Sequence, residues 1–350
     1  MPFYIRVPSL ITPVHCITKT EEPEYVTEII MSNDRFLLLE GADDEDFFTI
    51  ICNLLKQNEA QISAEKLYLL KKINIDTAQR IQGELGNRAK IEKICDLVAQ
   101  KPPDVNNRVL GFVDREFREF EWSNDLKDHI KTHKINKRLI WSRGHSIENY
   151  FFEISTLKKA FNDYLVSSFY QEAFEIFESK FEHTLRIACA LSLAGLSENL
   201  LTPIATSVNW QCIDITSTSL KIDLEEWGKI LNKKLKLDQL RIQKLFNKFE
   251  VYLNMTNQCD IETSRWLSHG HIGFNFMFVV YSKCLYITAS DLSDPRKNPS
   301  QEAEKVNQYK DTRFRTVANA WVRNQSVEFQ GNNLNDFPIK CFWMLINDFQ

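Results

Sequence analysis

RFLLLEGADDEDFF, residues 35–48, is the stretch of sequence that decides the fold. Its first five residues are mostly apolar, and a short apolar run bounded by turn residues is typical of a fully buried strand. Glu40 and Gly41 end this run, and the acidic residues that follow favour the start of a helix, because they can cap it and interact with its dipole. We therefore predict a strand over 35–39, a turn, and a helix that continues to about residue 57.

The same alternation of short apolar runs with helical patterns continues along the first half of the chain. We predict further strands over 66–73, 108–113 and 138–141. A turn at 86–90 leads into a helix with apolar residues at helical spacing, and the prolines at 102–103 end it. Alternating strands and helices are the signature of a parallel sheet covered by helices.

Helical periodicity replaces this alternation after about residue 155. It covers 157–196, 224–253 and 271–288, with at most a small β insertion near 208–215. Residues 290–312 are polar and contain two prolines, so we expect them to connect to the last, aromatic-rich segment.

We therefore predict an α/β fold followed by an all-helical part. The expected divisions are an N-terminal segment (1–30), an α/β domain (31–155), a mainly helical domain (156–290), and the polar connection with the C-terminal segment (291–350). A chain of 350 residues is long enough for about two domains of common size.

Composition excludes several classes of protein. The apolar fraction of 43% and the 10 glycines and 10 prolines exclude disordered and collagenous chains. Because the net charge is only −4, any site for a polyanion must be local. The eight cysteines are scattered without a CxxC pair, which indicates reduced core residues, and the sequence has neither a signal-peptide pattern at its start nor an apolar run of membrane-spanning length. We expect a soluble, cytoplasmic protein with no membrane association.

Carboxylates follow the predicted strands at the points where they end. Glu40 follows the first strand, Asp114 and Glu116 the third, and Glu148 the fourth. The carboxyl ends of parallel strands meet at one edge of a sheet, and Asp114 and Glu116 point to the same side if the chain is extended. Clustered carboxylates repel unless a cation neutralises them, and Mg²⁺ or Mn²⁺ prefers oxygen ligands. The pattern predicts metal-assisted cleavage of phosphodiester bonds.

Acidic residues after strands are also ordinary helix caps. We therefore assign Asp43, Asp44 and Asp46 to capping. Glu40 precedes the cap and is followed by a glycine that lets a ligand approach the backbone, so we expect a functional role for it.

Three motifs resemble those of the TOPRIM-fold nucleases related to the overcoming-lysogenization-defect nucleases, and in particular a domain found in effectors of the PARIS phage-defence system. They are LLLEGADDEDFF (37–48), VLGFVDREF (109–117) and GHSIENYFF (144–152), with a looser match at WLSHGHI (266–272). The resemblance covers about residues 30–155 and implies a TOPRIM-like nuclease domain there. It implies that Glu40 is the metal-binding and general acid/base glutamate, Asp114 the main metal ligand, and Glu148 a carboxylate for a second metal or its water. Glu116 stands where the family usually has an aspartate, which puts the metal geometry in question.

Supporting residues are expected around this site. His145 could orient a phosphate, while Arg88 and Lys90 open a helix in a manner that suits phosphate. Arg143 belongs to a basic stretch near the fourth strand that could contact nucleic acid. Arg115 should point to the opposite side from its acidic neighbours and hold the sheet or a nearby acid.

Other features concern partners. His269 and His271 flank Gly270, and we expect a structural role for them. The basic residues of 229–248 and the aromatic residues of 161–181 could contact nucleic acid and a second copy or partner, respectively. Neither a phosphate-binding P-loop nor GxGxxG occurs, so any ATPase of the system is another subunit.

Two functions remain open. The first is a Mg²⁺- or Mn²⁺-dependent nuclease of phage defence that cuts RNA, tRNA included, or DNA and is held inactive until it is triggered. The second is a catalytically degenerate TOPRIM-like module that binds a partner as a scaffold.

Overall fold

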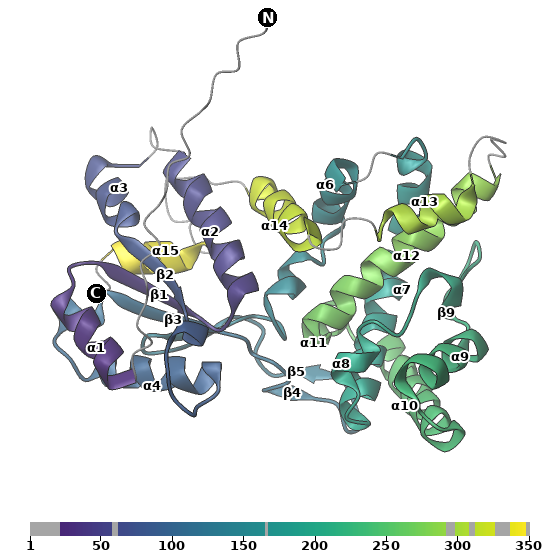
Figure 1. The fold of residues 1–350 in the computed structure, drawn as a ribbon, viewed down its shortest axis with the longest axis horizontal. Helices are drawn as coiled ribbons and strands as arrows, with labels where there is room; N and C mark the ends of the chain where they lie inside the picture. Colours follow the sequence, from purple (N-terminus) through teal and green to yellow (C-terminus); the bar gives the residue numbers. More distant parts are fainter. Residues whose placement is uncertain are drawn as a thin grey trace, which may run out of the picture.

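The structure is a computed structural model that describes residues 22–57, 62–164, 167–291, 298–307, 312–325 and 337–347. It consists of an α/β half and a helical half, which lie side by side at the left and right of Figure 1. The helix α14 (Arg313–Asn324) lies between them and packs against α2 (Ala42–Gln57) and α6 (Ile154–Tyr164).

The α/β half is built on a five-stranded sheet with the order β2-β1-β3-β7-β6. Its strands are β1 (Arg35–Leu39), β2 (Ile73–Thr77), β3 (Val109–Val113), β6 (Lys134–Asn136) and β7 (Leu139–Trp141). All neighbouring pairs are parallel except the edge pair β6 and β7. Every residue of β1 and β3 is buried, as expected for central strands covered on both faces.

Helices cover both faces of this sheet. One face packs against α1 (Glu22–Met31) and α4 (Asn87–Ala99), and the other against α2, α3 (Ala64–Lys71) and α15 (Lys340–Ile346). The two short strands β4 (Phe120–Glu121) and β5 (Lys127–Asp128) form a hairpin between β3 and β6. The C-terminal helix α15 therefore belongs to the core of the α/β half, although it lies last in the sequence.

The strand predicted over 66–73 is wrong. This stretch forms α3, whose first turn is capped by the Ser63 hydroxyl accepting a hydrogen bond from the Lys66 amide. Leu67 and Leu70, one helical turn apart, face the core, so the leucine pattern has the period of a helix. The strand follows as β2, over Ile73–Thr77.

The helical half surrounds the long central helix α7. Its other elements are α8 (Leu201–Ile204), α9 (Leu224–Leu235), α10 (Gln239–Gln258), α11 (Ile261–Leu267), α12 (Gly270–Asp291) and α13 (Pro299–Lys305), with the hairpin β8 (Ile213–Ile215) and β9 (Leu220–Ile222). The short helix α5 (Pro103–Asn106) belongs to the α/β half, where it lies between α4 and β3. Helices α10 and α12 pack along α7 (Tyr170–Ser197). Of the predicted polar connection, 292–297 and 308–311 lie outside the described residues.

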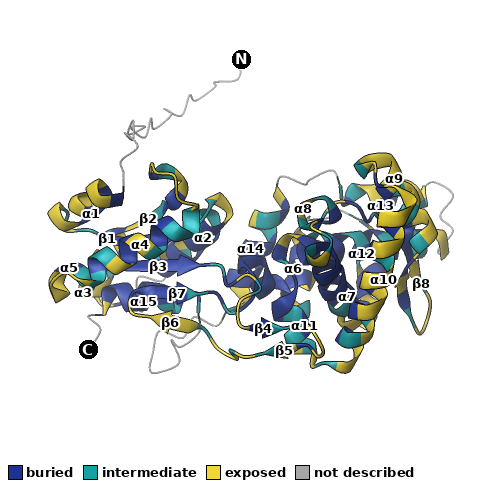
Figure 2. Ribbon diagram, turned by 90° about the horizontal axis from the view of Figure 1, so that it is seen from below, coloured by how far each residue is buried: buried dark blue, intermediate teal, exposed yellow. Residues whose placement is uncertain are grey.

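One apolar core extends from the sheet into the helical half, and Figure 2 shows the buried residues concentrated along it. Helix α12 is long and apolar enough to cross a membrane, but 72% of its apolar window is buried inside the protein. This burial is typical of the core helix of a soluble protein. The described cysteines are all free, and all except Cys259 are buried, as predicted; Cys16 lies outside the described residues.

Candidate active site

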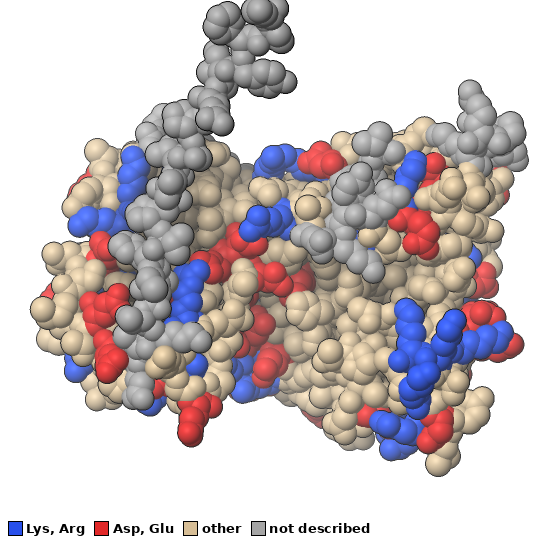
Figure 3. Space-filling view, viewed as in Figure 1, with Lys and Arg blue, Asp and Glu red and all other residues tan. Residues whose placement is uncertain are grey.

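A cavity of about 410 Å³ lies at the carboxyl ends of β1 and β3, between the sheet and the N-terminus of α12. Six carboxylates line it: Glu40, Asp43, Asp44, Asp114, Glu116 and Glu148. Figure 3 shows acidic side chains gathered along this junction of the two halves. The predicted carboxylates Glu40, Asp114, Glu116 and Glu148 are therefore brought together around one cavity.

Glu40 and Asp114 connect the ends of the two central strands. The Glu40 carboxylate accepts a hydrogen bond from the Asp114 amide, with 2.8 Å between Oε1 and the nitrogen. Burial raises the pKa of Glu40. Burial raises the pKa of Asp114 well above its usual range, and the nearby Asp44, Glu40 and Glu148 raise it further.

Asp44 has a second role besides the predicted cap. Its Oδ2 lies 2.9 Å from the Gly41 amide, so it does cap the turn before α2. The buried carboxyl also lines the cavity, where burial, Glu148 and Glu40 raise its pKa to about 8. By contrast, Asp46 pairs with Arg315 at 2.8 Å on an exposed side of α2 and does not line the cavity.

Glu148 differs from the other carboxylates because it has a cationic partner. It lies on the short helix η3 (Ile147–Phe151), where the Ser146 hydroxyl donates to it at 2.6 Å and His271 Nδ1 lies 2.8 Å away. Burial alone would raise the pKa of Glu148, but the hydrogen bond and charge of His271 lower it to about 2. The same hydrogen bond raises the pKa of His271 to about 9, so both are charged at neutral pH.

Gly270 permits the close approach of α12 to this carboxylate. A Cβ at position 270 would lie 1.9 Å from Ser146 Oγ and 2.4 Å from Glu148 Oε2. Both distances are too short for any side chain, so the helix from the second half can reach the site only with glycine here.

Glu116 corrects the expected extended geometry. Its φ of 55° places it in the left-handed region, so it does not alternate with Asp114 along a strand. The half-exposed carboxylate lies 3.7 Å from both Arg88 and Arg118. Glu116 still lines the cavity, but at its rim and with cationic neighbours.

Two histidines, the buried His145 and the half-buried His269, complete the wall of the cavity. The rings of His145 and His269 are 4.4 Å apart between their centroids. Burial lowers the pKa of His145 well below its usual range. Burial, together with the charge of His271, lowers the pKa of His269 to about 4. Both rings are therefore neutral at neutral pH, and the Nδ1 atom of each has no hydrogen-bond partner among the described residues.

The basic residues predicted around the site, Arg88, Lys90 and Arg143, do not line the acidic cavity. Arg88 holds the backbone beside the cavity, because its guanidinium donates a hydrogen bond of 2.5 Å to the Asp114 carbonyl and pairs with Glu92 at 2.8 Å. Lys90 is wrong as a phosphate ligand: it is buried, and its Nζ donates to the Ile81 carbonyl. Arg143 pairs with Asp128 at 2.5 Å and lines a different cavity.

Arg115 has the structural role that alternation predicts. Its guanidinium is fully buried and pairs with Asp128 at 2.7 Å. It also donates to four backbone carbonyls, those of Arg118, Glu119, Ile130 and Arg143. This network fixes the loops that carry Asp114 and His145.

The donor set fits a hard divalent cation by its chemistry. The cavity gathers carboxylate oxygens whose repulsion and burial raise three pKa values, and a cation placed among them would relieve that cost. Within the described residues, no three His, Cys, Asp or Glu side chains already stand close enough to hold a metal ion. Side-chain rotation or bridging water molecules would therefore have to complete the coordination. Mg²⁺ commonly retains several water ligands in protein sites.

Sequence reasoning assigned Asp44 to capping and His269 and His271 to a structural role, and it did not include them among the residues of the site. A helix-capping role accounts for an acidic residue at position 44 without any site. The two histidines come from the second half of the chain, more than 100 residues away from Glu148. The looser motif WLSHGHI was the one signal for them. A scan against protein-family models finds no match to this chain, and a search of curated proteins finds no similar sequence.

Proposed function

We propose that the chain is a Mg²⁺- or Mn²⁺-dependent nuclease that hydrolyses phosphodiester bonds at the acidic cavity. The observation that carries this proposal is the meeting of Glu40, Asp44, Asp114 and Glu148 from three separate segments. Burial and mutual repulsion both oppose the ionisation of carboxylates gathered at the carboxyl ends of parallel strands, so the cluster lowers stability and indicates a functional site.

A groove beside the cavity supports nucleic acid as the substrate. This adjoining space, of about 440 Å³, is lined by Phe117, Arg118, Trp122 and Leu201 and shares Glu116, His145 and His269 with the acidic cavity. Aromatic side chains stack on bases and arginine attracts phosphate. A single strand could therefore lie in this groove with one phosphate at the carboxylates.

The ion would be held by Glu40, Asp114 and Asp44, with Glu148 binding it directly or through water. When bound, it would supply electrostatic stabilisation of the phosphate and a more acidic water. The Asp114 amide orients Glu40, and His271 keeps Glu148 ionised. The neutral rings of His145 and His269 also line the cavity, where a ring N–H could donate a hydrogen bond to a phosphate oxygen.

The three ordered motifs support a TOPRIM-type nuclease of phage defence. By that resemblance we propose a cytoplasmic effector that is held inactive until triggered and works with a separate ATPase subunit, and that could act as a homodimer. Its substrate would be RNA, tRNA included, or DNA.

A second candidate is a degenerate TOPRIM-like scaffold. It is favoured by the turned-aside Glu116, which pairs with arginines, and by His271, which occupies one oxygen of Glu148. This candidate predicts partner binding that is independent of metal and of Glu40.

The test is cleavage of tRNA, single-stranded RNA, plasmid and linear DNA by the purified protein with Mn²⁺ or Mg²⁺. Glu40→Gln and EDTA should each abolish cleavage, whereas Asp46→Asn, a neutralisation on the same helix region but outside the cavity, should leave it unchanged. If the protein cuts nothing in vitro, toxicity on expression in cells should depend on Glu40. Toxicity or cleavage that survives Glu40→Gln would contradict the proposal.

A further inference from the structure

A local positive surface lies on α9 and α10, outside the proposed active site. Between residues 233 and 248 the chain has six basic residues and one acidic residue, Asp238, in a protein whose net charge is −4. Figure 3 shows Lys and Arg side chains gathered at the lower right, over α9 and α10 as they lie in Figure 1. The six basic residues are all exposed: Lys233, Lys234, Lys236, Arg241, Lys244 and Lys248.

Few carboxylates neutralise this surface. Lys244 pairs with Glu198 at 3.1 Å, and the Asp238 carboxylate accepts a hydrogen bond from the Arg241 amide as the N-cap of α10. For the other five basic residues, no carboxylate of the described part of the chain lies within ion-pairing distance. The surface therefore attracts an anionic partner.

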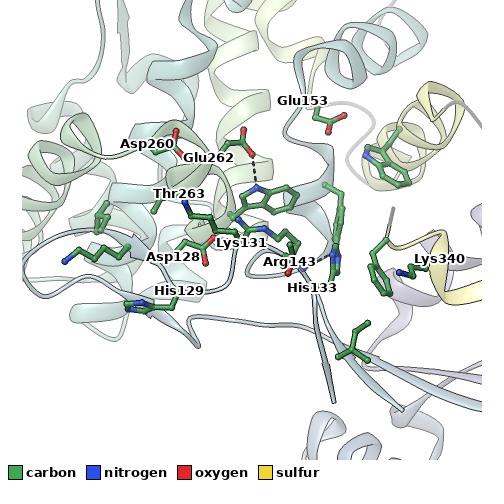
Figure 4. Close-up of a pocket in the computed structure, with 18 of the residues that line it drawn as sticks. Asp128, His129, Lys131, His133, Arg143, Glu153, Asp260, Glu262, Thr263 and Lys340 are labelled. Carbon is green, nitrogen blue, oxygen red and sulfur yellow. Dashed lines mark hydrogen bonds and ion pairs between the residues drawn. The ribbon is translucent and has the colours of Figure 1, made fainter. Parts of the chain in front are cut away.

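Basic residues elsewhere are balanced by acids. A cavity of about 1070 Å³ between the two halves is lined by four carboxylates and four Lys or Arg side chains. In Figure 4, Asp128 lies close to Arg143, with which it pairs at 2.5 Å, and Asp260 and Glu262 lie on the same side of this cavity as Lys131. This mixture favours neither sign of charge, in contrast to the surface on α9 and α10.

Three of the six basic residues form a stripe on α10. Arg241, Lys244 and Lys248 are three and four residues apart, so they lie on one face of the helix and span about 10 Å along its axis. Phosphates of one stacked strand are about 3.4 Å apart along the axis of a duplex. The basic stripe, defined by these three residues, therefore has the length of about three successive phosphates.

The basic stripe borders the groove beside the acidic cavity. Glu198, the partner of Lys244, directly follows the last residue of α7, and Leu201 lines the groove. The Cα atoms of Glu198 and Leu201 are at most about 11 Å apart, because three residues separate them. The end of α7 is held against α10 by a hydrogen bond of 2.7 Å between the Ser197 and Tyr252 hydroxyls. A strand that leaves the acidic cavity through the groove would therefore meet the basic stripe.

We propose that the basic stripe binds the backbone of a nucleic-acid polymer, RNA or DNA, whose scissile phosphate lies in the acidic cavity. The strand would pass Phe117, Arg118 and Trp122 in the groove and cross the end of α7 to α10. Lysines also attract acidic protein surfaces, but the aromatic groove that leads to the stripe favours a strand with bases. The position of the scissile phosphate rests on the proposed function, whereas binding to the stripe requires no cleavage.

Binding is measured without cleavage, by fluorescence anisotropy of the full chain in EDTA. The probes are fluorescein-labelled single-stranded RNA and DNA of about 20 nucleotides, which is longer than one typical strand-binding site, and a tetranucleotide of each. At least one of the long strands should bind saturably and more tightly than its tetranucleotide. Only the long strand reaches from the groove to the basic stripe, so the stripe should affect the long strand alone.

Two double variants with the same loss of charge locate the site. Arg241→Gln combined with Lys248→Gln should weaken binding of the long strand at least fivefold and change binding of the tetranucleotide less than twofold. The slope of log affinity against log salt concentration should become shallower by about 1.4, because two phosphate contacts of a single strand are lost. Lys66→Gln combined with Lys101→Gln, at exposed positions of the α/β half, should change neither quantity.

Two further measurements separate this proposal from the nuclease proposal and from an acidic protein partner. Glu40→Gln should bind the long strand at least as tightly as the wild type in EDTA, because it removes a negative charge, so a protein without nuclease activity can still pass the test. Where the protein cuts, the Arg241→Gln and Lys248→Gln variant should raise KM for the long strand and leave kcat unchanged. Polyglutamate at equal charge concentration should displace the strand less effectively than unlabelled strand does. Absence of saturable binding, equal weakening by the two double variants, or equal displacement by polyglutamate would overturn the proposal.

Discussion

Replacing Asp44 with asparagine should stabilise the protein in the absence of metal. Burial, Glu148 and Glu40 raise the pKa of Asp44 from 3.8 to about 8, so at pH 7 folding requires this carboxyl to take up a proton. The interval between pH 3.8 and pH 7 is about three pH units, and each unit corresponds to about 1.4 kcal/mol, which sets a ceiling of about 4 kcal/mol. An asparagine avoids this cost and keeps an oxygen that can accept the Gly41 hydrogen bond.

The sign of the effect gives a pH dependence. An acid whose pKa is raised in the folded state contributes its full stability at low pH and loses it as the pH rises from 3.8 towards 8. The gain from Asp44→Asn, measured by urea unfolding in EDTA, should therefore be up to about 3 kcal/mol larger at pH 7 than at pH 5. Asp46→Asn, which loses only an exposed ion pair, should change stability by less than about 1 kcal/mol. An Asp44→Asn protein that is no more stable than the wild type at pH 7, or whose gain does not grow with pH, would refute the reasoning.

Three further perturbations test the packing around the site. Gly270→Ala should cost about 1–3 kcal/mol of unfolding free energy through overpacking. Gly86→Ser, where an added Cβ meets nothing within 4 Å and serine is suited to the N-cap position, should change the unfolding free energy by only a few tenths of a kcal/mol, and equal costs in chemical denaturation would show that the close approach at Gly270 is absent. Arg115→Met should lower the free energy of unfolding by about 3–5 kcal/mol, because it leaves the buried Asp128 with one fewer cationic partner. Asp128→Asn should lower it less in the Arg115→Met background than in the wild type, and additive costs in this double-mutant cycle would mean that the pair is not coupled. Because burial lowers the pKa of His133 to about 3, the stability of the folded state should fall as the pH drops from about 6.5 towards 3, and His133→Gln should reduce this fall in acid titrations followed by circular dichroism; an unchanged acid transition would count against it.

Hydrophobic runs identified the centre of the sheet. The strands at 35–39, 109–113 and 139–141 follow the predicted ones closely, because residues buried on both faces form near-continuous apolar runs. The edge strand β2 was not predicted, because its sequence INIDT is only partly buried and its hydrophobic pattern is weak. The leucine-rich helix α3 that precedes it is more apolar, so the strand was predicted there instead. Local pattern fails where burial is incomplete.

The candidate site was predictable only in part. The topology of a parallel sheet brings Glu40 and Asp114 together, so their proximity followed from strand order alone. Contacts between residues that are far apart in the sequence could not be predicted in this way. His271 reaches Glu148 only because α12 starts beside η3. Likewise, the left-handed backbone of Glu116 depends on the loop that Arg115 fixes, which no spacing in the sequence specifies.

Binding of Mn²⁺ to the purified protein, followed by electron paramagnetic resonance of the free ion, tests the central claim most directly. The account predicts saturable binding at neutral pH that Asp114→Asn abolishes and Asp46→Asn leaves unchanged. Binding that persists in Asp114→Asn, or a wild-type protein that binds no more Mn²⁺ than this variant does, would contradict the assignment of the acidic cavity as a metal-dependent active site.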